Sequence, residues 1–381
     1  MSKKELLKLA TQVNTDWLEE QLNWCVCKIE KNMERYKDLF PSACTTDGTY
    51  RIKSNDDWTN GFWTGMLWLS YEFTKSEKFK SRALANVESF EKRLDEHFIL
   101  DHHDIGFLYS LSTFAGYQIL GDQKCKELTI RAADVLANRY QEKGEFIQAW
   151  GPLGDKNEYR LIIDSLMNLP LLFEATKLTG QNKYATLAKK HYVTVLKYAI
   201  RKDATTYHTY FFNPQTGKPS HGATHQGNKD NSIWARGQSW AILGMALNEN
   251  LLENHNYPQI YQDIVDVFLN NLPKDLVPYW DFDFTDDNPS DKDSSSLAIV
   301  ACGLLESGNA YKDSEELAKG ILVRLQADYT SKDLETNEGL LLHGVYAHKE
   351  GKGIDESNLW GDYFYFEALM RLYKKDWKKY W

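Results

Sequence analysis

The chain lacks the long apolar segments that membrane proteins and secreted precursors carry. No stretch approaches the roughly 20 consecutive apolar residues of a membrane span. The first residues, MSKKELLKLATQV, are polar and contain no apolar segment typical of a signal peptide. We therefore expect a cytoplasmic protein that does not act on a membrane.

Cysteine is scarce, and its spacing does not indicate a metal site. The chain has 5 cysteines, which are Cys25, Cys27, Cys44, Cys125 and Cys302. Apart from one Cys-x-Cys pair they follow no zinc-binding spacing, and an odd number argues against a disulfide framework. The sequence predicts that these cysteines are buried and reduced.

Positive charge is also in deficit. Lys and Arg number 45 against 54 Asp and Glu, for a net charge of −9, which argues against a nucleic-acid-binding surface. Aromatic residues, by contrast, make up 13% of the chain, with 12 Trp and 22 Tyr. Aromatic rings fill large cores and also form platforms for sugars, so both interpretations stay open.

Apolar residues recur at helical spacing along the chain. One such stripe, in steps of three and four, consists of Leu22, Val26, Ile29, Met33, Tyr36 and Phe40. It predicts a helix that buries one face. The same pattern recurs over 128–136, 184–196 and 260–268.

A second set of segments is apolar on all sides and follows loops rich in Gly, Trp, Asp and Ser. These segments begin near Gly61, Asp104, Asp164, Arg236, Asp293 and Gly361. A helix that is apolar all round must be enclosed by protein, whereas a one-sided helix can face water. The two sets predict six helical hairpins, hence an all-α (α/α)6 barrel, with residues 1–381 as a single catalytic domain.

The inner helices of such a barrel begin at one common rim, where the loops before them would meet. The long segment 201–235, rich in Gly, His, Asn and Thr, is one of these loops. Long ordered loops in compact domains are usually functional, so we expect a lid or binding loop there.

Two aspartates stand at the beginning of inner helices, Asp104 in DHHDIGFLY and Asp164 in RLIIDSLMNLP. Either could simply cap its helix, because Asp is a favoured N-cap. Alternatively they form an acid/base pair. Three large aliphatic residues at 161–163 should bury Asp164 and raise its pKa, while Asp104 lies beside His103.

Other catalytic patterns are weaker. Adjacent residues such as those of the DHHD run, 101–104, do not point at a common centre, so we expect no metal. The DSSS run at 293–296 lacks the context of a nucleophilic serine and is typical of an N-cap cluster. Arg236 could bind a substrate carboxylate or form a buried ion pair with an aspartate at the rim. Tryptophans near the helix entrances, of which one or two could form a sugar platform, are Trp58, Trp63, Trp150, Trp234, Trp240 and Trp360.

Four motifs, HHDIGF, IIDSLMNLP, THQG and WARGQSW, resemble those of the unsaturated glucuronyl hydrolases of glycoside hydrolase family 88. The similarity extends from WTNGFWTG to LWGDYFYFEAL, nearly the whole chain. The resemblance implies an (α/α)6 barrel without a cofactor. It also implies removal of the terminal 4,5-unsaturated uronic acid from glycosaminoglycan disaccharides and oligosaccharides that lyases produce. We expect a monomer or a weak dimer.

The resemblance also assigns roles to residues. It implies that Asp164 protonates C4 of the vinyl ether and then activates water for C5, while Asp104 stabilises the developing positive charge. The motifs imply that the substrate is contacted by Gly222, Thr224, Gln226, Arg236, Trp240, His208 and Trp150. We also expect Trp58 and Ser357 to bind the substrate.

One segment departs from the family pattern. Some members carry two serines and a lysine in a C-terminal loop that receives a substrate sulfate, whereas residues 354–359 here keep only Ser357. Asp355 and Glu356 would repel sulfate, so the sequence predicts a preference for unsulfated or differently sulfated disaccharides.

Three alternatives remain. The related unsaturated rhamnogalacturonyl hydrolases share the barrel but act on pectin fragments, and HHDIGF favours the glucuronyl branch. Sugar 2-epimerases rely on histidines where this chain has aspartates. A non-catalytic carbohydrate-binding toroid would need the tryptophans without the aspartate pair.

Overall fold

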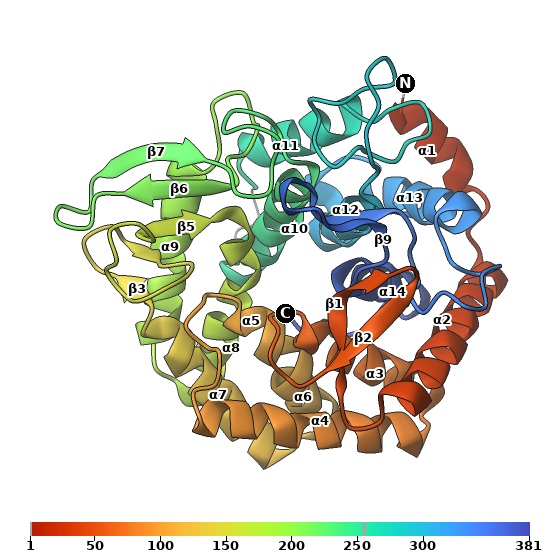
Figure 1. Ribbon diagram of the computed structural model, residues 1–381, viewed down its shortest axis with the longest axis horizontal. Helices are drawn as coiled ribbons and strands as arrows, with labels where there is room; N and C mark the ends of the chain where they lie inside the picture. Colours follow the sequence, from red (N-terminus) through yellow and green to blue (C-terminus); the bar gives the residue numbers. More distant parts are fainter. Residues whose placement is uncertain (1, 254–256) are drawn as a thin grey trace.

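Two kinds of helix alternate along the chain and form two concentric rings in the computed structural model, which describes residues 2–253 and 257–381 (Figure 1). The outer helices are α2 (Thr15–Tyr36), α4 (Glu77–Asp95), α7 (Gln123–Ala137), α9 (Lys183–Tyr198), α11 (Gln259–Asn270) and α13 (Ser314–Asp328). The inner ring comprises α3 (Asn60–Thr74), α5 (Ile105–Tyr109) with the π-helix η1 (Ser110–Phe114) and α6 (Ala115–Leu120), η2 (Ile163–Met167) with α8 (Leu169–Thr179), α10 (Ala235–Leu251), α12 (Ser294–Ser307) and α14 (Leu359–Tyr373). The predicted (α/α)6 barrel is confirmed.

Burial separates the rings as the apolar patterns require. Every residue from Ala235 to Glu249 of α10 and from Ser294 to Leu304 of α12 is buried. In the outer helix α2, only positions on one face are buried. An inner helix is therefore surrounded by protein, and an outer helix shields it from water.

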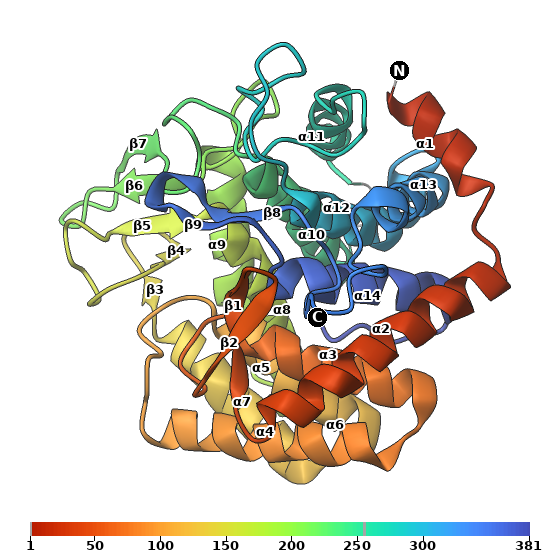
Figure 2. The same cartoon turned by 45° about the vertical axis from the view of Figure 1, so that its right-hand side comes forward.

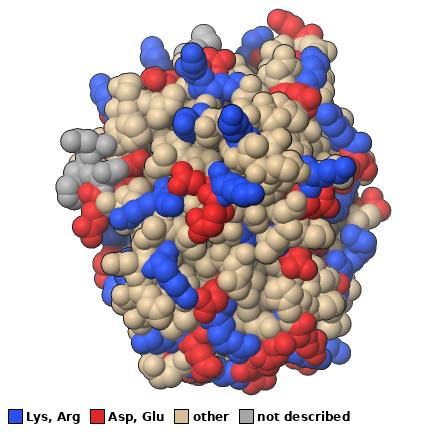
Figure 3. Space-filling view, turned by 90° about the vertical axis from the view of Figure 1, so that its left-hand side faces the viewer, with Lys and Arg blue, Asp and Glu red and all other residues tan. Residues whose placement is uncertain are grey.

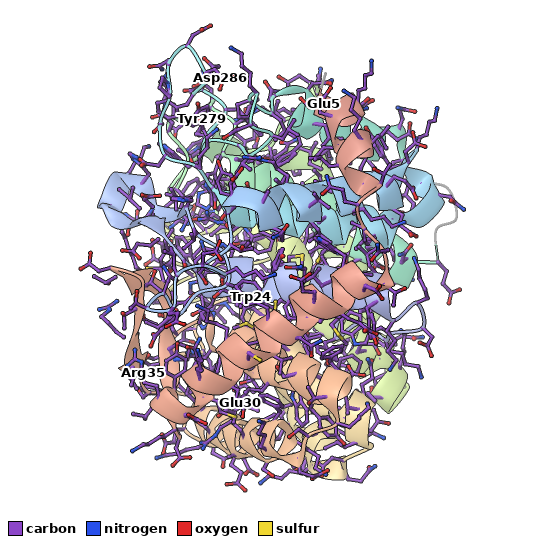
Figure 4. The ribbon with its side chains drawn as sticks, turned by 90° about the vertical axis from the view of Figure 1, so that its right-hand side faces the viewer. Glu5, Trp24, Glu30, Arg35, Tyr279 and Asp286 are labelled. Carbon is purple, nitrogen blue, oxygen red and sulfur yellow. The ribbon has the colours of Figure 1, made fainter. Side chains whose placement is uncertain are left out.

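Helix α2 illustrates how the outer ring is anchored (Figure 4). Its Trp24 packs edge-on against Tyr365 of α14, with ring centroids 6.4 Å apart. Glu30, further along the helix, pairs with Lys78 of α4 at the surface. One turn of α2 thus contacts the inner ring while the next contacts the neighbouring outer helix.

Local signals place the helix ends. The side chain of Asn14 accepts the Trp17 amide at 2.9 Å at the beginning of α2. The helix ends at Tyr36, and Lys37 adopts a left-handed φ of 52°. Phe40, expected as the last residue of this helical stripe, instead begins strand β1, because the backbone reverses at Lys37.

The loops of the predicted all-helical chain contain short antiparallel strands, which lie at one end of the barrel (Figure 2). Two-stranded hairpins are β1 (Phe40–Thr46) with β2 (Thr49–Lys53), β3 (Tyr140–Gln141) with β4 (Phe146–Ile147), and β8 (Gly344–Ala347) with β9 (Lys352–Glu356). A three-stranded sheet joins β5 (Arg160–Ile162), β6 (Thr209–Phe212) and β7 (Pro219–Ala223). The segment 201–235 is therefore an ordered hairpin extended by a turn. Short single-turn helices η3 (Gly308–Ala310) and η4 (His348–Glu350) complete the connections.

The remaining helix, α1 (Ser2–Ala10), lies beside α13 at the outside of the ring (Figure 1). Within the described residues, no helix combines the length and the apolar character needed to cross a membrane. All five cysteines are free thiols, as predicted. The prediction that all are buried is wrong for Cys27, which lies on the exposed face of α2.

Surface charge is mixed in sign. On the face formed around α9 and the β5–β7 sheet, Lys and Arg side chains alternate with Asp and Glu side chains (Figure 3). The described residues on this face form no extended basic patch, which agrees with the net charge of −9.

Candidate active site

A cavity of about 300 Å³ opens at the strand-bearing end of the barrel. It is lined by Trp58, His103, Asp104, Trp150, Asp164, His208, His225, Gln226, Trp234, Arg236, Trp240, Tyr346, Ala347, Glu350 and Lys352. Both predicted catalytic aspartates lie in it. These residues come from the loops that precede four inner helices, from η2 and the first two turns of α10, and from the β8–β9 hairpin, which explains why they are far apart in the sequence.

Asp104 and Asp164 face one another across His103. The Nε2 atom of His103 lies 3.3 Å from Asp104 Oδ1 and 3.4 Å from Asp164 Oδ1. One donor atom from each of the three residues lies within 4.8 Å of the others. The carboxyl groups are thus close enough for the charge of one to act strongly on the other.

The two carboxyl groups have opposite protonation tendencies. Burial and the neighbouring charge of Asp104 raise the pKa of Asp164 well above its ordinary value. Burial also acts on Asp104, but interaction with His103 and His102 outweighs it and lowers the pKa of Asp104. The site therefore favours the protonated form of Asp164 and the ionised form of Asp104, the division that acid/base catalysis uses.

Neither aspartate is a helix cap. Asp104 occupies the N-cap position of α5, yet its side chain makes no capping hydrogen bond. Asp164 lies in the first turn of η2, which also has no side-chain cap, and its Oδ1 atom is buried without a hydrogen-bond partner among the described atoms. Both carboxyl groups are consequently available to a ligand in the cavity.

His103 is held neutral by its surroundings. Its side chain is 1% exposed, and burial lowers its pKa to about 4. A neutral imidazole carries one N–H. Placed on Nε2, that proton lies between the two carboxyl groups, so His103 can separate them without adding a positive charge.

His208 presents a defined hydrogen-bond donor to the cavity. Its Nδ1 atom accepts the backbone N–H of His225 at 2.8 Å and that of Gln226 at 3.3 Å. Burial, with the charges of His225 and nearby arginines, lowers the pKa of His208 well below its ordinary value. Because Nδ1 is an acceptor in the neutral ring, the proton resides on Nε2.

Arg236 forms the buried ion pair that the sequence suggested, with Asp293, and it also lines the cavity. Its Nη1 atom donates to Asp293 Oδ2 at 2.6 Å and to the Val345 carbonyl at 2.6 Å. Its Nη2 atom donates to the Tyr346 carbonyl at 2.6 Å and lies 3.4 Å from Gln226 Oε1. Arg236 therefore joins α10 to the beginning of α12 and to strand β8, and its orientation is fixed.

An aromatic wall forms one side of the cavity. The rings of Trp58 and Trp360 stack with centroids 5.4 Å apart, and Trp58 Nε1 donates to the Tyr346 hydroxyl at 2.8 Å. Trp360 Nε1 in turn donates to Ser295 Oγ at 2.9 Å. Trp58 is held in place from behind and presents apolar surface to the cavity, as a sugar platform requires.

A histidine, a glutamate and a lysine lie at the mouth of the cavity. His225 Nε2 lies 2.9 Å from Glu350 Oε1, which connects the 201–235 segment to the β8–β9 connection. The Lys352 Nζ atom lies 3.9 Å from the centroid of the Tyr346 ring and forms no ion pair with a described residue. Lys352 is therefore a cation available to an anionic ligand.

Three predicted contact residues do not line the cavity. Gly222 is in strand β7, opposite Tyr210, and Thr224 Oγ1 accepts the Gly227 amide at 2.7 Å. Both support the turn that carries His225 and Gln226. Ser357 is 2% exposed, and its backbone amide donates to Thr45 Oγ1 at 3.0 Å. It packs inside the wall behind β1.

The structure places Asp355 and Glu356, the predicted source of sulfate repulsion, in contacts outside the cavity lining. Asp355 Oδ1 lies 2.6 Å from His343 Nδ1, and Glu356 accepts the Asp47 amide at 2.7 Å. Neither side chain lines the cavity. The repulsion of a substrate sulfate by these two carboxylates stays a prediction.

Several cavity residues were not singled out as contacts from the sequence. They are His103, His225, Trp234, Tyr346, Ala347, Glu350 and Lys352. His103, His225 and Trp234 lie inside the quoted motifs HHDIGF, THQG and WARGQSW and could have been found there. Tyr346, Glu350 and Lys352 lie in a loop without a motif, and only the hairpin geometry brings them to the cavity.

A metal ion is usually held by several His, Cys, Asp or Glu side chains. Among the described residues, one group of three such side chains is close enough to do so, and it consists of His103, Asp104 and Asp164. With Asp164 protonated and His103 neutral, this group carries a single negative charge. A divalent cation would first have to displace the proton of Asp164, so the donor set is better suited to proton transfer.

The chain is similar to known proteins over most of its length. The model of Glycosyl Hydrolase Family 88 matches residues 32–316. The unsaturated chondroitin disaccharide hydrolase of Streptococcus pneumoniae (strain ATCC BAA-255 / R6) is 46% identical over 361 residues, covering 93% of this chain and 91% of that protein. The crystal structure of unsaturated glucuronyl hydrolase from Streptococcus agalactiae is similar with a TM-score of 0.93 and 43% identity, covering 97% of this chain and 94% of that chain. An aspartate-to-asparagine mutant of the latter, complexed with dGlcA-GalNAc6S, gives a TM-score of 0.86 at 38% identity, covering 98% and 97%.

Proposed function

Because this chain belongs to glycoside hydrolase family 88, we propose that it releases the terminal 4,5-unsaturated uronic acid from lyase-generated glycosaminoglycan oligosaccharides. The observation that carries the proposal is Asp164, a buried carboxyl group with a raised pKa and an unpartnered oxygen in the cavity. Such a group can donate a proton at neutral pH and accept one afterwards.

The reaction is hydration of the C4=C5 vinyl ether. Asp164 donates its proton to C4, and positive charge develops over C5 and the ring oxygen. The resulting Asp164 carboxylate takes a proton from water as the water oxygen bonds to C5, which restores the acid. The hemiketal at C5 then opens the ring, and the hemiacetal left at C1 expels the aglycone as an alcohol. One water molecule is consumed.

Asp104 stays ionised throughout. Its carboxylate, within 4.8 Å of Asp164, lowers the energy of the positive charge that develops on the sugar ring. Its charge also keeps Asp164 protonated before the substrate binds. Asp104 is thus an electrostatic partner and Asp164 the proton carrier.

The lining residues suit an unsaturated uronide. His208 offers an Nε2–H, Gln226 and Arg236 offer polar side-chain groups, and Trp240 closes the interior wall. Trp58 and Trp150 supply apolar faces at the rim. Gly222 and Thr224 act through the turn that carries Gln226, and Ser357 contributes to the wall only.

The proposal includes the cellular and domain setting. Free thiols at all five cysteines favour the cytoplasm, where thiols stay reduced. The catalytic and binding residues come from loops along most of the chain, so we propose that residues 1–381 act as one catalytic domain.

One assay tests the function. The protein is incubated with an unsaturated chondroitin disaccharide while the absorbance of the conjugated C4=C5 chromophore is followed. We expect the absorbance to fall, and we expect no product from the matching saturated disaccharide. Turnover of unsaturated rhamnogalacturonides alone would place the chain in the pectin branch. Binding of the disaccharide without loss of the chromophore would indicate a non-catalytic toroid.

A further inference from the structure

Helix α5 is capped by a residue that does not belong to it. In a helix that begins after an N-cap aspartate, the aspartate side chain ordinarily accepts the backbone N–H two or three residues later. Three residues after Asp104, that N–H group belongs to Phe107. That amide instead donates to Asn168 Oδ1 at 2.9 Å, in a buried hydrogen bond.

Asn168 stands between the two aspartate-bearing elements. It follows η2, the turn that contains Asp164, and its Nδ2 atom lies 3.5 Å from the Asp164 carbonyl oxygen. Its backbone contacts α5 directly, because a Cβ atom at Gly106 would lie only 2.4 Å from the Asn168 Cα atom. Glycine at 106 is what permits this close approach.

We propose that Asn168 is a positioning residue, which caps α5 from the neighbouring inner helix and thereby leaves the Asp104 carboxylate free to face Asp164. The inference rests on the proposed function for the catalytic roles of Asp104 and Asp164, whereas the capping of α5 by Asn168 is a structural observation. One side chain connects the amide of α5 to the turn of Asp164, and it holds the two groups at their working separation.

The competing arrangement is close at hand. Without Asn168 the Phe107 amide would be buried and unpaired, which is costly. The side chain of Asp104 occupies the N-cap position of α5, from which an aspartate ordinarily accepts this amide. Asp104 would then turn away from His103 and Asp164.

A retracted Asp104 has a measurable electrostatic consequence. The groups that face Asp164 are His103 and Asp104 at the beginning of α5, and Arg236 on α10. Burial and Asp104 raise the pKa of Asp164, whereas Arg236 lowers it. Moving the Asp104 charge away therefore lowers the pKa of Asp164, and activity falls at a lower pH on the basic side of the profile.

The test compares kcat against pH for the wild type, Asn168→Ala and Asn168→Asp with an unsaturated chondroitin disaccharide. We expect Asn168→Ala to lose about 10- to 100-fold in kcat, as misplaced catalytic groups do, with KM changed less. The basic limb of its pH profile, where kcat falls as the pH rises, should move to lower pH. Asn168→Asp keeps an acceptor for the Phe107 amide but loses the Nδ2 donor to the Asp164 carbonyl, so the basic limb of its pH profile should not move to lower pH, whatever its kcat.

Asn248→Ala is the matched control. Asn248 is a buried asparagine of α10, and its Nδ2 atom donates to the Leu166 carbonyl in η2 at 2.9 Å. It supports the same turn without touching α5. We expect this variant to lose thermal stability while the pH of its basic limb stays that of the wild type.

The outcomes separate cleanly. A wild type that leaves the chromophore intact contradicts the proposed function. An active wild type with an unshifted basic limb in Asn168→Ala, or the same shift in Asn248→Ala, overturns the role of Asn168. If Asn168→Ala does not fold, the crystal structure of Asn168→Ser decides, because the serine hydroxyl ends one bond short of the Oδ1 atom that accepts the Phe107 amide. Asp104 bonded to the Phe107 amide supports the proposal, and Asp104 still beside His103 overturns it.

Discussion

The Arg236 guanidinium donates to the Asp293 carboxylate at 2.6 Å, and the two side chains are only 3% and 0% exposed. This pair connects the entrances of two inner helices, α10 and α12, directly behind the cavity. Arg236 also donates to two carbonyls of strand β8. The pair therefore fixes the wall on which the substrate would rest.

Asp293→Asn should destabilise the protein by about 3–5 kcal/mol, because removing one partner leaves a buried charge uncompensated. Urea unfolding measures the change. The matched control is Asp283→Asn, which breaks the solvent-exposed pair with Lys229 and should cost less than about 1 kcal/mol. Equal effects of the two substitutions would contradict a structural role for the buried pair.

Asp164→Asn should abolish nearly all turnover and leave substrate binding intact. Asparagine has the size of aspartate but cannot donate the proton that C4 requires. Single-turnover kinetics and equilibrium binding of an unsaturated disaccharide measure the two effects separately. A variant that retained wild-type kcat would exclude Asp164 as the proton donor.

Reaction in heavy water should place deuterium at C4 of the released uronic acid. Asp164 exchanges its acidic proton with solvent, so the group that it transfers is deuterium under these conditions. Mass spectrometry and proton NMR of the product locate the label. A product without deuterium at C4 would rule out protonation of the double bond and indicate direct hydrolysis at C1.

Because of Asp362, the free energy of unfolding should fall as the pH rises from about 4 to about 7. Its carboxylate accepts the Leu340 and Leu341 amides at 2.8 and 2.9 Å and the Tyr50 hydroxyl at 2.9 Å. Burial nevertheless raises its pKa from 3.8 to about 7. The folded state thus binds the proton more tightly than the unfolded state, so stability is greatest below the unfolded pKa and declines as the pH rises to the folded pKa.

Asp362→Asn should remove this part of the pH dependence, which amounts to at most about 4 kcal/mol. Urea unfolding at a series of pH values provides the comparison, with Asp328→Asn on the exposed face of α13 as the control. Parallel curves for the wild type and Asp362→Asn would show that Asp362 is ionised in the folded protein well below pH 7.

Lys352→Met should reduce turnover of a 6-sulfated disaccharide more than turnover of an unsulfated one. Lys352 lines the cavity and forms no ion pair with a described residue, so its charge is available to the sulfate. Asp355→Asn and Glu356→Gln serve as controls, because both side chains bond elsewhere. If either control changed the ratio of sulfated to unsulfated turnover, the result would support the sulfate repulsion predicted from the sequence.

The periodicity of apolar residues was sufficient to predict the barrel. The helices α10 and α12 are apolar on all sides and α2 on one side, and burial follows that division. The same reasoning extended the first helix to Phe40, because a stripe of apolar residues does not reveal where the backbone turns. The left-handed Lys37 ends that helix, and nothing in the pattern marks this residue.

The sequence by itself determined the two rings of helices and placed Asp104 and Asp164 at helix entrances, because both depend on local spacing and capping preferences. It left open whether either aspartate was a cap. Only the tertiary structure decided that question, since the cap of α5 is Asn168 from the next inner helix. It likewise decided that Lys352 faces the cavity while Asp355 and Glu356 do not, because the β8–β9 hairpin sets those directions.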